Sequence, residues 1–488
     1  MTKQHIVKSV FWLTVAEIIF NLSGYIVHAG VGRILGPSEY GRYGLVITLT
    51  TMIIMLIGRG IPSAMNKYIS EISETKAGMV GVIKNQAAKA QLILIGSVTV
   101  VFYLLSPTIA SVLNDPSLTS LFQLSSLIIP SFAAASFYFY YFTGIHRFNI
   151  QSALKVIRSV ARVILIIGLA LLFKIEGTIA GYIAAPLTVF AVGWAIDKFW
   201  ISKKYPADPK ASFNWRKLVA YAWPITLFML FYEIFITLDL YMVKAILKDD
   251  FLTGIYNGSL TVGRIPYYLF YALAIVLLPT ISKSTAENNA PETKKTIQQS
   301  LRFMLMFLLP IITLMYIYAY PIINIFYGFG YSEAARPMQI LLFGVGFLTI
   351  FYVMSFAFNG AGKVKIPMYI ALFGMIVKII LTYIFIQSQG IFGAAAATTI
   401  TSVIVMAIML YYINKHFKGL IQSSSISKMF FSAGLMYLIS FIFPGGKYFF
   451  ILWGLILFGA YLLLLSMFGE LKKEDFNLLK KLVSKKQT

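Results

Sequence analysis

The chain has 488 residues, of which 59% are hydrophobic and 12% are charged. A soluble domain of this length needs far more charged surface, so the composition excludes a soluble globular protein and indicates a polytopic membrane protein. The sequence has no cysteine, and its four histidines are scattered, so it predicts no disulfide, no metal site and no cofactor. The net charge of +23 comes mainly from basic residues in short loops between apolar runs. This distribution is typical of the positively charged cytoplasmic loops of membrane proteins, and it does not favour a nucleic-acid partner.

Apolar segments follow one another along the whole chain, and most of them are long enough to cross a bilayer as a helix. They cover residues 10–32, 43–65, 88–106, 120–143, 155–173, 177–197, 219–243, 255–279, 303–325, 337–358, 367–387, 391–413, 429–443 and 448–468. Gly36-Pro37, between the first two segments, predicts a turn. We therefore predict an all-α polytopic membrane protein with about 14 transmembrane helices.

Lysine and arginine are distributed unevenly between the two sides of these segments. About thirty of them fall on the side of both termini and about seven fall on the other side, which predicts cytoplasmic termini. We expect a multi-pass protein of the cell membrane. The tail, residues 469–488, mixes leucines with lysine pairs, which favours an amphipathic helix attracted by anionic lipids, with a solvated tail as the alternative.

A shift of 213–216 residues aligns the two halves of the chain. It places residues 41–43 on 254–256, residues 142–147 on 358–363, and Arg162 on Lys378. Each repeat holds six helices, an even number, which predicts two pseudo-symmetric lobes in parallel orientation. The predicted parts are an N-terminal lobe (1–200), a cytoplasmic linker (201–217), a C-terminal lobe (218–414), two additional helices (415–468) and the tail (469–488).

Polar side chains form stripes on several predicted helices. Glu17, Asn21, Gly24 and His28 follow one another at spacings of four, three and four, which places them on one helical face. The eighth segment carries a similar face. Its polar members include Asn257, Thr261 and Arg264.

Ionisable residues at membrane depth mark the candidate site. They are Glu17, Arg59, Arg162, Glu233, Asp239, Arg264 and Lys378. Exposing all of them to lipid would cost about 20 kcal/mol, so we expect them to face a hydrated cavity or one another. A cationic cavity for a pyrophosphate is one interpretation, and structural ion pairs such as Arg59 with Glu17 are the other. The carboxylates are candidates for coupling to a proton or sodium ion, and the membrane potential is an alternative driving force.

The first helical hairpin resembles a known family. Its residues Arg33–Gly44, Gly60–Ala64 and Lys67–Glu71 are similar to the polysaccharide biosynthesis, or Wzx-type oligosaccharide flippase, family of the multidrug/oligosaccharidyl-lipid/polysaccharide exporter (MOP) superfamily. The resemblance implies alternating access by two lobes and transport of a polyprenyl-pyrophosphate-linked oligosaccharide to the outer leaflet. It also implies cavity cations on the first, second and eighth helices. Arg59 and Arg264 match that pattern, whereas the first helix offers Glu17 instead of a cation.

The leading hypothesis is therefore a flippase for cell-surface polysaccharide biosynthesis, which is not an enzyme and has no catalytic residue. Its expected partners are the lipid-linked glycan, membrane lipids and possible glycan assembly enzymes, and the expected state is a monomer. A MATE-like drug or cation antiporter is one alternative, but its cavity would be expected to be acidic. A membrane glycan polymerase or ligase is another, but the predicted outer loops are too short to hold its acid and base groups.

Overall fold

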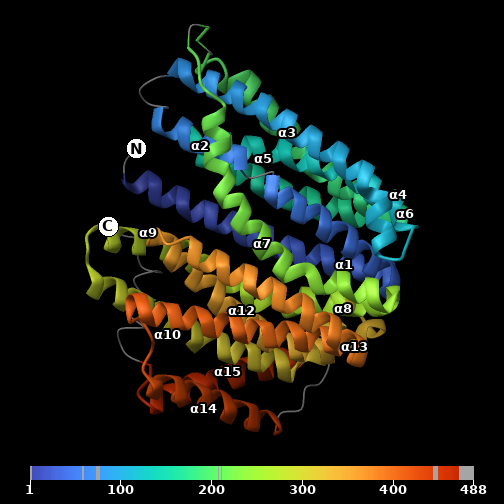
Figure 1. Cartoon of the computed structure of the whole chain (residues 1–488), viewed down its shortest axis with the longest axis vertical. Coiled ribbons are helices and arrows are strands. Elements are labelled where there is room, and N and C mark those ends of the chain that lie inside the picture. The colour runs from blue at the N-terminus through green and yellow to red at the C-terminus, as the bar shows by residue number, and fades with distance from the viewer. Residues whose placement is uncertain are drawn as a thin grey trace. The chain divides into compact units, whose positions relative to one another are not determined.

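The computed structural model describes residues 3–57, 60–72, 77–206, 208–209, 211–442 and 449–471. These residues form helices joined by short turns, with no strand among them (Figure 1). The α-helices are α1 (Lys3–Ile57), α2 (Gly60–Ile72), α3 (Ala77–Val112), α4 (Leu118–Ser125), α5 (Ile128–Gly144), α6 (Phe148–Ile196), α7 (Arg216–Leu247), α8 (Asp250–Gly263), α9 (Ile265–Ala286), α10 (Ala290–Ile317), α11 (Ala319–Tyr327), α12 (Ala335–Gly360), α13 (Lys365–Phe417), α14 (Ser423–Ser440) and α15 (Phe450–Met467). A π-helix, η1 (Asp197–Ile201), follows α6, and a 3₁₀-helix, η2 (Phe329–Ala334), precedes α12.

The chain divides into two compact units, residues 1–257 and 258–488. In the first unit, α1 packs against α6, and α2 packs against α5 and α7. In the second unit, α12 packs against α9 and α13, and α14 packs against α10 and α15. The lobe limits given above follow from the sequence offset, and they stay a prediction.

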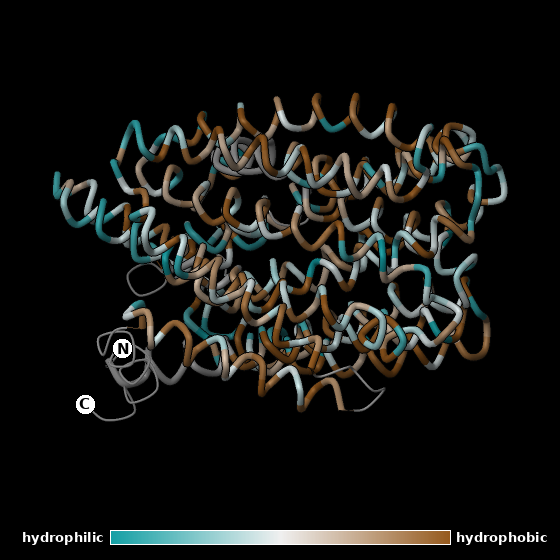
Figure 2. Tube along the Cα trace, turned by 90° about the horizontal axis from the view of Figure 1, so that it is seen from below, coloured by the Kyte–Doolittle hydropathy of each residue, from teal (hydrophilic) through white to brown (hydrophobic). Residues whose placement is uncertain are grey.

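Eight helical stretches of the described chain are long and apolar enough to cross a membrane. Hydrophobic residues mostly line the lengths of the helices, and hydrophilic residues gather at their ends (Figure 2). Three stretches, residues 15–72, 148–201 and 365–417, contain 58, 54 and 53 residues. A straight helix of that size would be about 80 Å long, more than twice the roughly 30 Å hydrocarbon core of a bilayer.

Each of these long stretches reverses direction at residues with non-helical backbone angles. In α1 the break is at Gly36, and His28 Nδ1 lies 2.9 Å from the Tyr40 hydroxyl. A straight helix would separate residues twelve apart by about 18 Å. In α6 the chain also turns back, because a Cβ on Gly181 would lie 2.5 Å from Ile166 Cα. The sequence correctly predicted a turn at Gly36-Pro37, between the first two apolar segments.

The turns within α6 and α13 share the same backbone conformation. Lys174 has φ 50° and ψ −125°, and Gly390, 216 positions later, has φ 57° and ψ −134°. In both turns a glycine then lies directly against the backbone carbonyl oxygen of the residue eight positions before it. The two pairs are Gly177 with Leu169, where a Cβ would lie 2.0 Å from the oxygen, and Gly393 with Phe385, where it would lie 1.9 Å away.

A second turn is duplicated at the same offset. The amides of Arg147 and Lys363 each donate to the carbonyl oxygen five residues earlier, at 2.8 and 2.9 Å. The residues before them, His146 and Gly362, both have positive φ, at 58° and 72°. Because backbone geometry repeats with the sequence offset, these parts of the chain are internal duplicates in structure as well as in sequence.

Two glycines that the predicted repeat makes equivalent pack directly against each other in the first unit. A Cβ on Gly41 would lie 2.7 Å from the amide nitrogen of Gly254, and a Cβ on Gly254 would lie 1.8 Å from the Pro37 carbonyl oxygen. Backbone this close leaves no room for a side chain, so both positions require glycine. This contact brings the second half of α1 against the first half of α8.

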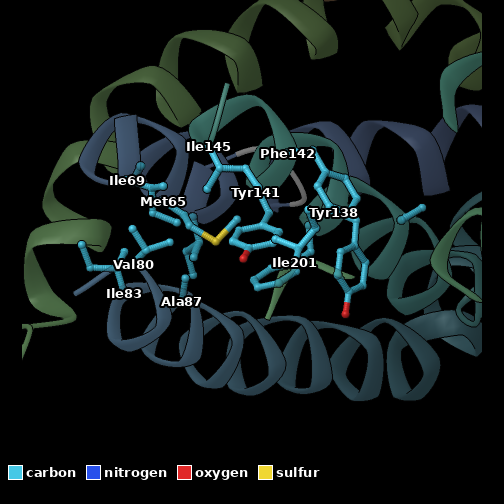
Figure 3. Close-up of a cluster of buried hydrophobic side chains, with 14 of the residues drawn as sticks. Met65, Ile69, Val80, Ile83, Ala87, Tyr138, Tyr141, Phe142, Ile145 and Ile201 are labelled. Carbon is cyan, nitrogen blue, oxygen red and sulfur yellow. The ribbon is translucent and has the colours of Figure 1, made fainter. Parts of the chain in front are cut away.

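An apolar cluster joins α2, α3, α5 and η1 inside the first unit. Figure 3 shows Met65, Ile69, Val80, Ile83, Tyr138, Tyr141 and Ile201 turned toward one another. Beside it, Lys84 forms an ion pair with Asp197 at the start of η1, and its ammonium lies 4.8 Å from the Tyr141 ring centre.

The last two helices dock on α10 in the second unit. The Tyr461 hydroxyl of α15 donates to the Met306 carbonyl at 3.0 Å, and Arg302 Nε donates to Glu470 Oε1 at 2.7 Å. Most of the predicted basic tail, residues 472–488, lies outside the described residues.

Candidate functional site

A row of three cations lies on one face of α6. Lys155, Arg158 and Arg162 are spaced by three and four residues, so their side chains project from the same side of the helix. All three are partly buried. Since this part of α6 belongs to a stretch that is long and apolar enough to cross a membrane, we expect each cation to need partners that lipid does not provide.

Aromatic rings of α1 and α5 surround this row. The Phe20 ring centre lies 5.7, 5.1 and 4.8 Å from Lys155 Nζ, Arg158 Cζ and Arg162 Cζ, respectively. Arg158 also lies over Phe132, with 4.3 Å between its Cζ and the ring centre. Such cation–π contacts stabilise a positive charge by about 0.5–2 kcal/mol each without neutralising it.

The carboxylate of Glu17 reaches the row. Glu17 of α1 forms an ion pair with Lys155, and its side chain remains 44% exposed. An ion pair between Glu17 and Arg59 is one interpretation of the sequence, but Arg59 lies outside the described residues. The four charged side chains of Glu17, Lys155, Arg158 and Arg162 together carry three positive charges and one negative charge, a formal sum of +2.

Arg162 retains unused hydrogen-bonding capacity. Its Nε is buried and has no hydrogen-bond partner within the described part of the chain. The guanidinium lies against Gly24, where a Cβ would come within 2.2 Å of Nη2. A buried donor without an acceptor costs about 1–3 kcal/mol, which an anionic ligand would recover.

The predicted stripe on α1 continues from Gly24 to His28. His28 Nδ1 lies 2.9 Å from the Tyr40 hydroxyl, and the Tyr43 hydroxyl lies 2.8 Å from that of Tyr182. The Tyr40 and Tyr43 rings stack at 5.4 Å between centres. The stripe thus runs from the ion pair at Glu17 into a tyrosine cluster, whereas Asn21 is exposed.

The other predicted residues of the first unit lie on α7 and α8. Asp239 is fully buried and accepts a hydrogen bond from Tyr256 at 2.8 Å. Asn257 is buried and its side-chain amide donates to the Tyr40 carbonyl at 3.3 Å. Glu233 is half-buried, and its carbonyl accepts from Thr237. Asp239 and Asn257 are therefore engaged by the protein itself.

Three predicted residues belong to the second unit. Thr261 and Arg264 are half-buried, near the end of α8 and at the start of α9. Lys378 is fully buried on α13, on the same face as Thr382. Of the predicted set, the structure brings together Glu17, His28 and Arg162 around the row on α6.

The sequence prediction missed two members of the row. Lys155 stands at the edge of an apolar segment and Arg158 stands between two apolar turns, so neither was counted among the deep cations. Their spacing of seven and four residues before Arg162 was the available signal. The aromatic partners could not be found in this way, because Phe20 and Phe132 lie on other helices, and only the packing of α1 and α5 against α6 brings them to the row.

A second polar cluster joins the ends of several helices in the first unit. Lys244 of α7 is 4% exposed and pairs with Asp115 at 2.9 Å and with Asp250 at 2.5 Å. Burial alone would raise the pKa of Asp115, but hydrogen bonds from Ser117 and Lys244 outweigh it and lower that pKa. Arg42 donates to Ser117 at 2.7 Å and extends the cluster to α1. We call these residues the Lys244 cluster.

Duplicated reversing helices and a partly buried row of cations are typical of one class, the membrane transporters built from internal repeats. The solved structure of a lipid II flippase, MurJ, in an inward closed conformation superimposes with a TM-score of 0.76 at 18% identity, over 93% of this chain and 98% of that one. The chain has the fold of the MOP superfamily of transporters. It belongs to the polysaccharide biosynthesis protein family, whose model matches residues 6–285, and a MatE model matches residues 224–384.

Curated relatives are similar over most of the chain. An uncharacterized membrane protein of Methanocaldococcus jannaschii is 25% identical over 429 residues, which cover 83% of this chain and 97% of the relative. The lipid II flippase MurJ of Bacillus subtilis is 22% identical over 465 residues, which cover 84% and 83%.

Proposed function

We propose that the protein is a flippase that moves a polyprenyl-pyrophosphate-linked oligosaccharide from the cytoplasmic to the outer leaflet of the cell membrane. The family and the fold support a lipid-linked substrate. In this proposal the chain crosses the membrane fourteen times with both termini cytoplasmic, and two six-helix lobes alternate access to a site between them. It performs no catalytic step.

The observation that carries the proposal is the buried Nε of Arg162, which has no hydrogen-bond partner among the residues that the structure describes and belongs to a row of three cations. A pyrophosphate diester carries about two negative charges, which matches the formal sum of +2 of the row with Glu17. Arginine suits this ligand because its planar fork can donate two parallel hydrogen bonds to phosphate oxygens. Lys378, the repeat equivalent of Arg162, is proposed to contribute from the second lobe together with Arg264, and Arg59 is proposed to contribute from the first lobe.

Aromatic side chains around the row support the same substrate. Phe20 lies over Arg162 without neutralising its charge, and Phe132 lies over Arg158 in the same way, so the rings keep positive charge at the site where the phosphate is proposed to bind. A membrane potential negative inside would drive two negative charges outward by about 4–5 kcal/mol per 100 mV. Under this proposal, Glu17 sets the charge of the site through Lys155, and coupling to a proton or sodium ion is not required.

Binding of undecaprenyl pyrophosphate to the purified protein tests the proposal. Loss of one charge-assisted hydrogen bond corresponds to about 1.5–3 kcal/mol, so Arg162→Gln should weaken binding about 10- to 100-fold. Arg147→Gln is the matched control, because Arg147 is exposed at the start of the same helix. Undecaprenyl phosphate, with fewer charges, should bind more weakly to the wild type. Equal binding by the wild type and Arg162→Gln would contradict the assignment of the site.

An antiporter related to the MATE exporters is the second candidate, favoured by the MatE match over residues 224–384. It predicts efflux of a cationic dye driven by a proton gradient, and no selective binding of undecaprenyl pyrophosphate. The row of cations argues against it, because three positive charges repel a cationic substrate.

A further inference from the structure

A groove of about 640 Å³ lies within the second unit, between α10, α12 and α13. It is lined by Tyr316, Arg336, Gln339, Ile340, Phe343, Phe392 and Thr399. Its volume falls within the range of small-molecule sites, roughly 300–1,000 Å³. Its lining includes no residue of the cation row and neither Lys378 nor Arg264, so the groove is formed by a different set of residues from the proposed substrate site.

The polar groups inside the groove already bond to the protein. Gln339 Nε2 donates to the Tyr316 carbonyl at 2.9 Å, and Thr399 Oγ1 donates to the Ile340 carbonyl at 2.9 Å. The Tyr316 and Phe343 rings pack at 5.6 Å between centres and form one wall. What remains for an occupant is mainly apolar surface, which suits a hydrocarbon chain.

One cation stands in this apolar lining. Arg336 lies in the first turn of α12, its side chain is exposed, and no hydrogen bond or ion pair engages it within the described part of the chain. Glu333 precedes it in η2 but does not line the groove. An apolar groove with an arginine is complementary to an amphiphile with an anionic headgroup.

The groove lies at one end of its helices. Tyr316 is near the end of α10, Arg336 begins α12, and Phe392 follows the turn at Gly390 in α13. The two ends of α13 carry Lys365 and Lys415, which the sequence assigns to the cytoplasmic side, and the turn at Gly390 lies between them at the opposite end of the hairpin. The groove is therefore at the level of the outer leaflet in the predicted orientation, with Arg336 at headgroup depth.

We propose that this groove binds an anionic phospholipid of the outer leaflet, with its phosphate at Arg336 and an acyl chain along Tyr316, Phe343 and Phe392. The site is distinct from the proposed substrate site and does not depend on translocation. The lipid would brace α10, α12 and α13 at the end where α13 reverses.

Photo-crosslinking in nanodiscs tests this inference locally. Phosphatidylglycerol and phosphatidylcholine with the same photoreactive acyl chain are compared, and labelled peptides are mapped by mass spectrometry. Phosphatidylglycerol should label the peptides of Tyr316, Phe343 and Phe392 about threefold more than phosphatidylcholine, as expected for one exposed ion pair. Arg336→Gln should remove that preference.

Two further variants distinguish the effect of the Arg336 charge from the effect of the shape of the groove. Arg33→Gln changes another exposed arginine on the same predicted side and should leave the preference intact. Ile340→Trp fills the groove and should reduce labelling by both lipids. Equal labelling by the two lipids in the wild type, or an unchanged preference in Arg336→Gln, would overturn the proposal.

Discussion

Replacing Lys244 by methionine should destabilise the first unit measurably. The Lys244 side chain is 4% exposed, and its partners Asp115 and Asp250 are 13% and 31% exposed. Removing one partner of a buried ion pair costs about 3–5 kcal/mol, because the remaining charge stays desolvated. Water reaches Asp250, so we expect the lower end, about 3 kcal/mol, and a fall in melting temperature of about 5 °C.

Thermal unfolding of the detergent-solubilised protein, followed by tryptophan fluorescence, measures this effect. The control is Lys283→Met, which breaks an ion pair with Glu287 whose side chains are 78% and 56% exposed, and it should change the melting temperature little. In a double-mutant cycle, Asp115→Asn should cost less in the Lys244→Met background than in the wild type. Additive effects, or equal shifts for Lys244→Met and Lys283→Met, would refute the buried cluster.

The pH dependence gives an independent check on Asp115. Its folded pKa lies below the ordinary value of 3.8, so its ionised form stabilises the fold above that value and the contribution is lost as the pH falls through the lower, folded pKa. The loss of stability in Asp115→Asn should therefore be the same at pH 7 and pH 5. A loss that disappears by pH 5 would contradict the ion pair.

Three other predictions follow from the same contacts. Gly24→Ala should displace the Arg162 guanidinium, since the new Cβ would lie 2.2 Å from Nη2, and a titration should show about tenfold weaker binding of undecaprenyl pyrophosphate. Gly96→Ala, at a position with open space, should leave this binding unchanged. Gly254→Ala should lower the melting temperature by several degrees because its Cβ would meet the Pro37 carbonyl; an unchanged value would mean that the helices do not approach so closely. Single cysteines at Ser38 and Asp208, in a chain with none of its own, should react with an impermeant maleimide from opposite sides of the membrane, and labelling of both from outside would exclude cytoplasmic termini.

Local patterns in the sequence predicted the helical class and one of the turns well. Long apolar runs predict membrane helices because a helix satisfies all of its backbone hydrogen bonds within one segment, and about 20 apolar residues are enough to cross the bilayer in this form. Gly36-Pro37 predicted the first reversal. The turns at Lys174 and Gly390 were not predicted, but they lie 216 residues apart, at the offset that aligns the two halves of the sequence.

The candidate site was only partly predictable. Helical spacing placed Glu17 and His28 on one face, but it could not show that Lys155 would take the carboxylate. That pairing depends on α1 packing against α6, which is a tertiary contact. The contact between Gly41 and Gly254 could not be predicted either, because an alignment of two repeats shows which residues are equivalent but not whether they touch.

Translocation in proteoliposomes tests the central claim most directly. The probe is a fluorescent disaccharide linked to undecaprenyl pyrophosphate, and a membrane-impermeant quencher reports the fraction in the outer leaflet over time. The account predicts transfer by the wild type and by Arg147→Gln, and a rate at least tenfold lower for Arg162→Gln at equal reconstituted amounts. Transfer by Arg162→Gln at the wild-type rate, or no transfer by any form while a cationic dye is exported, would contradict it.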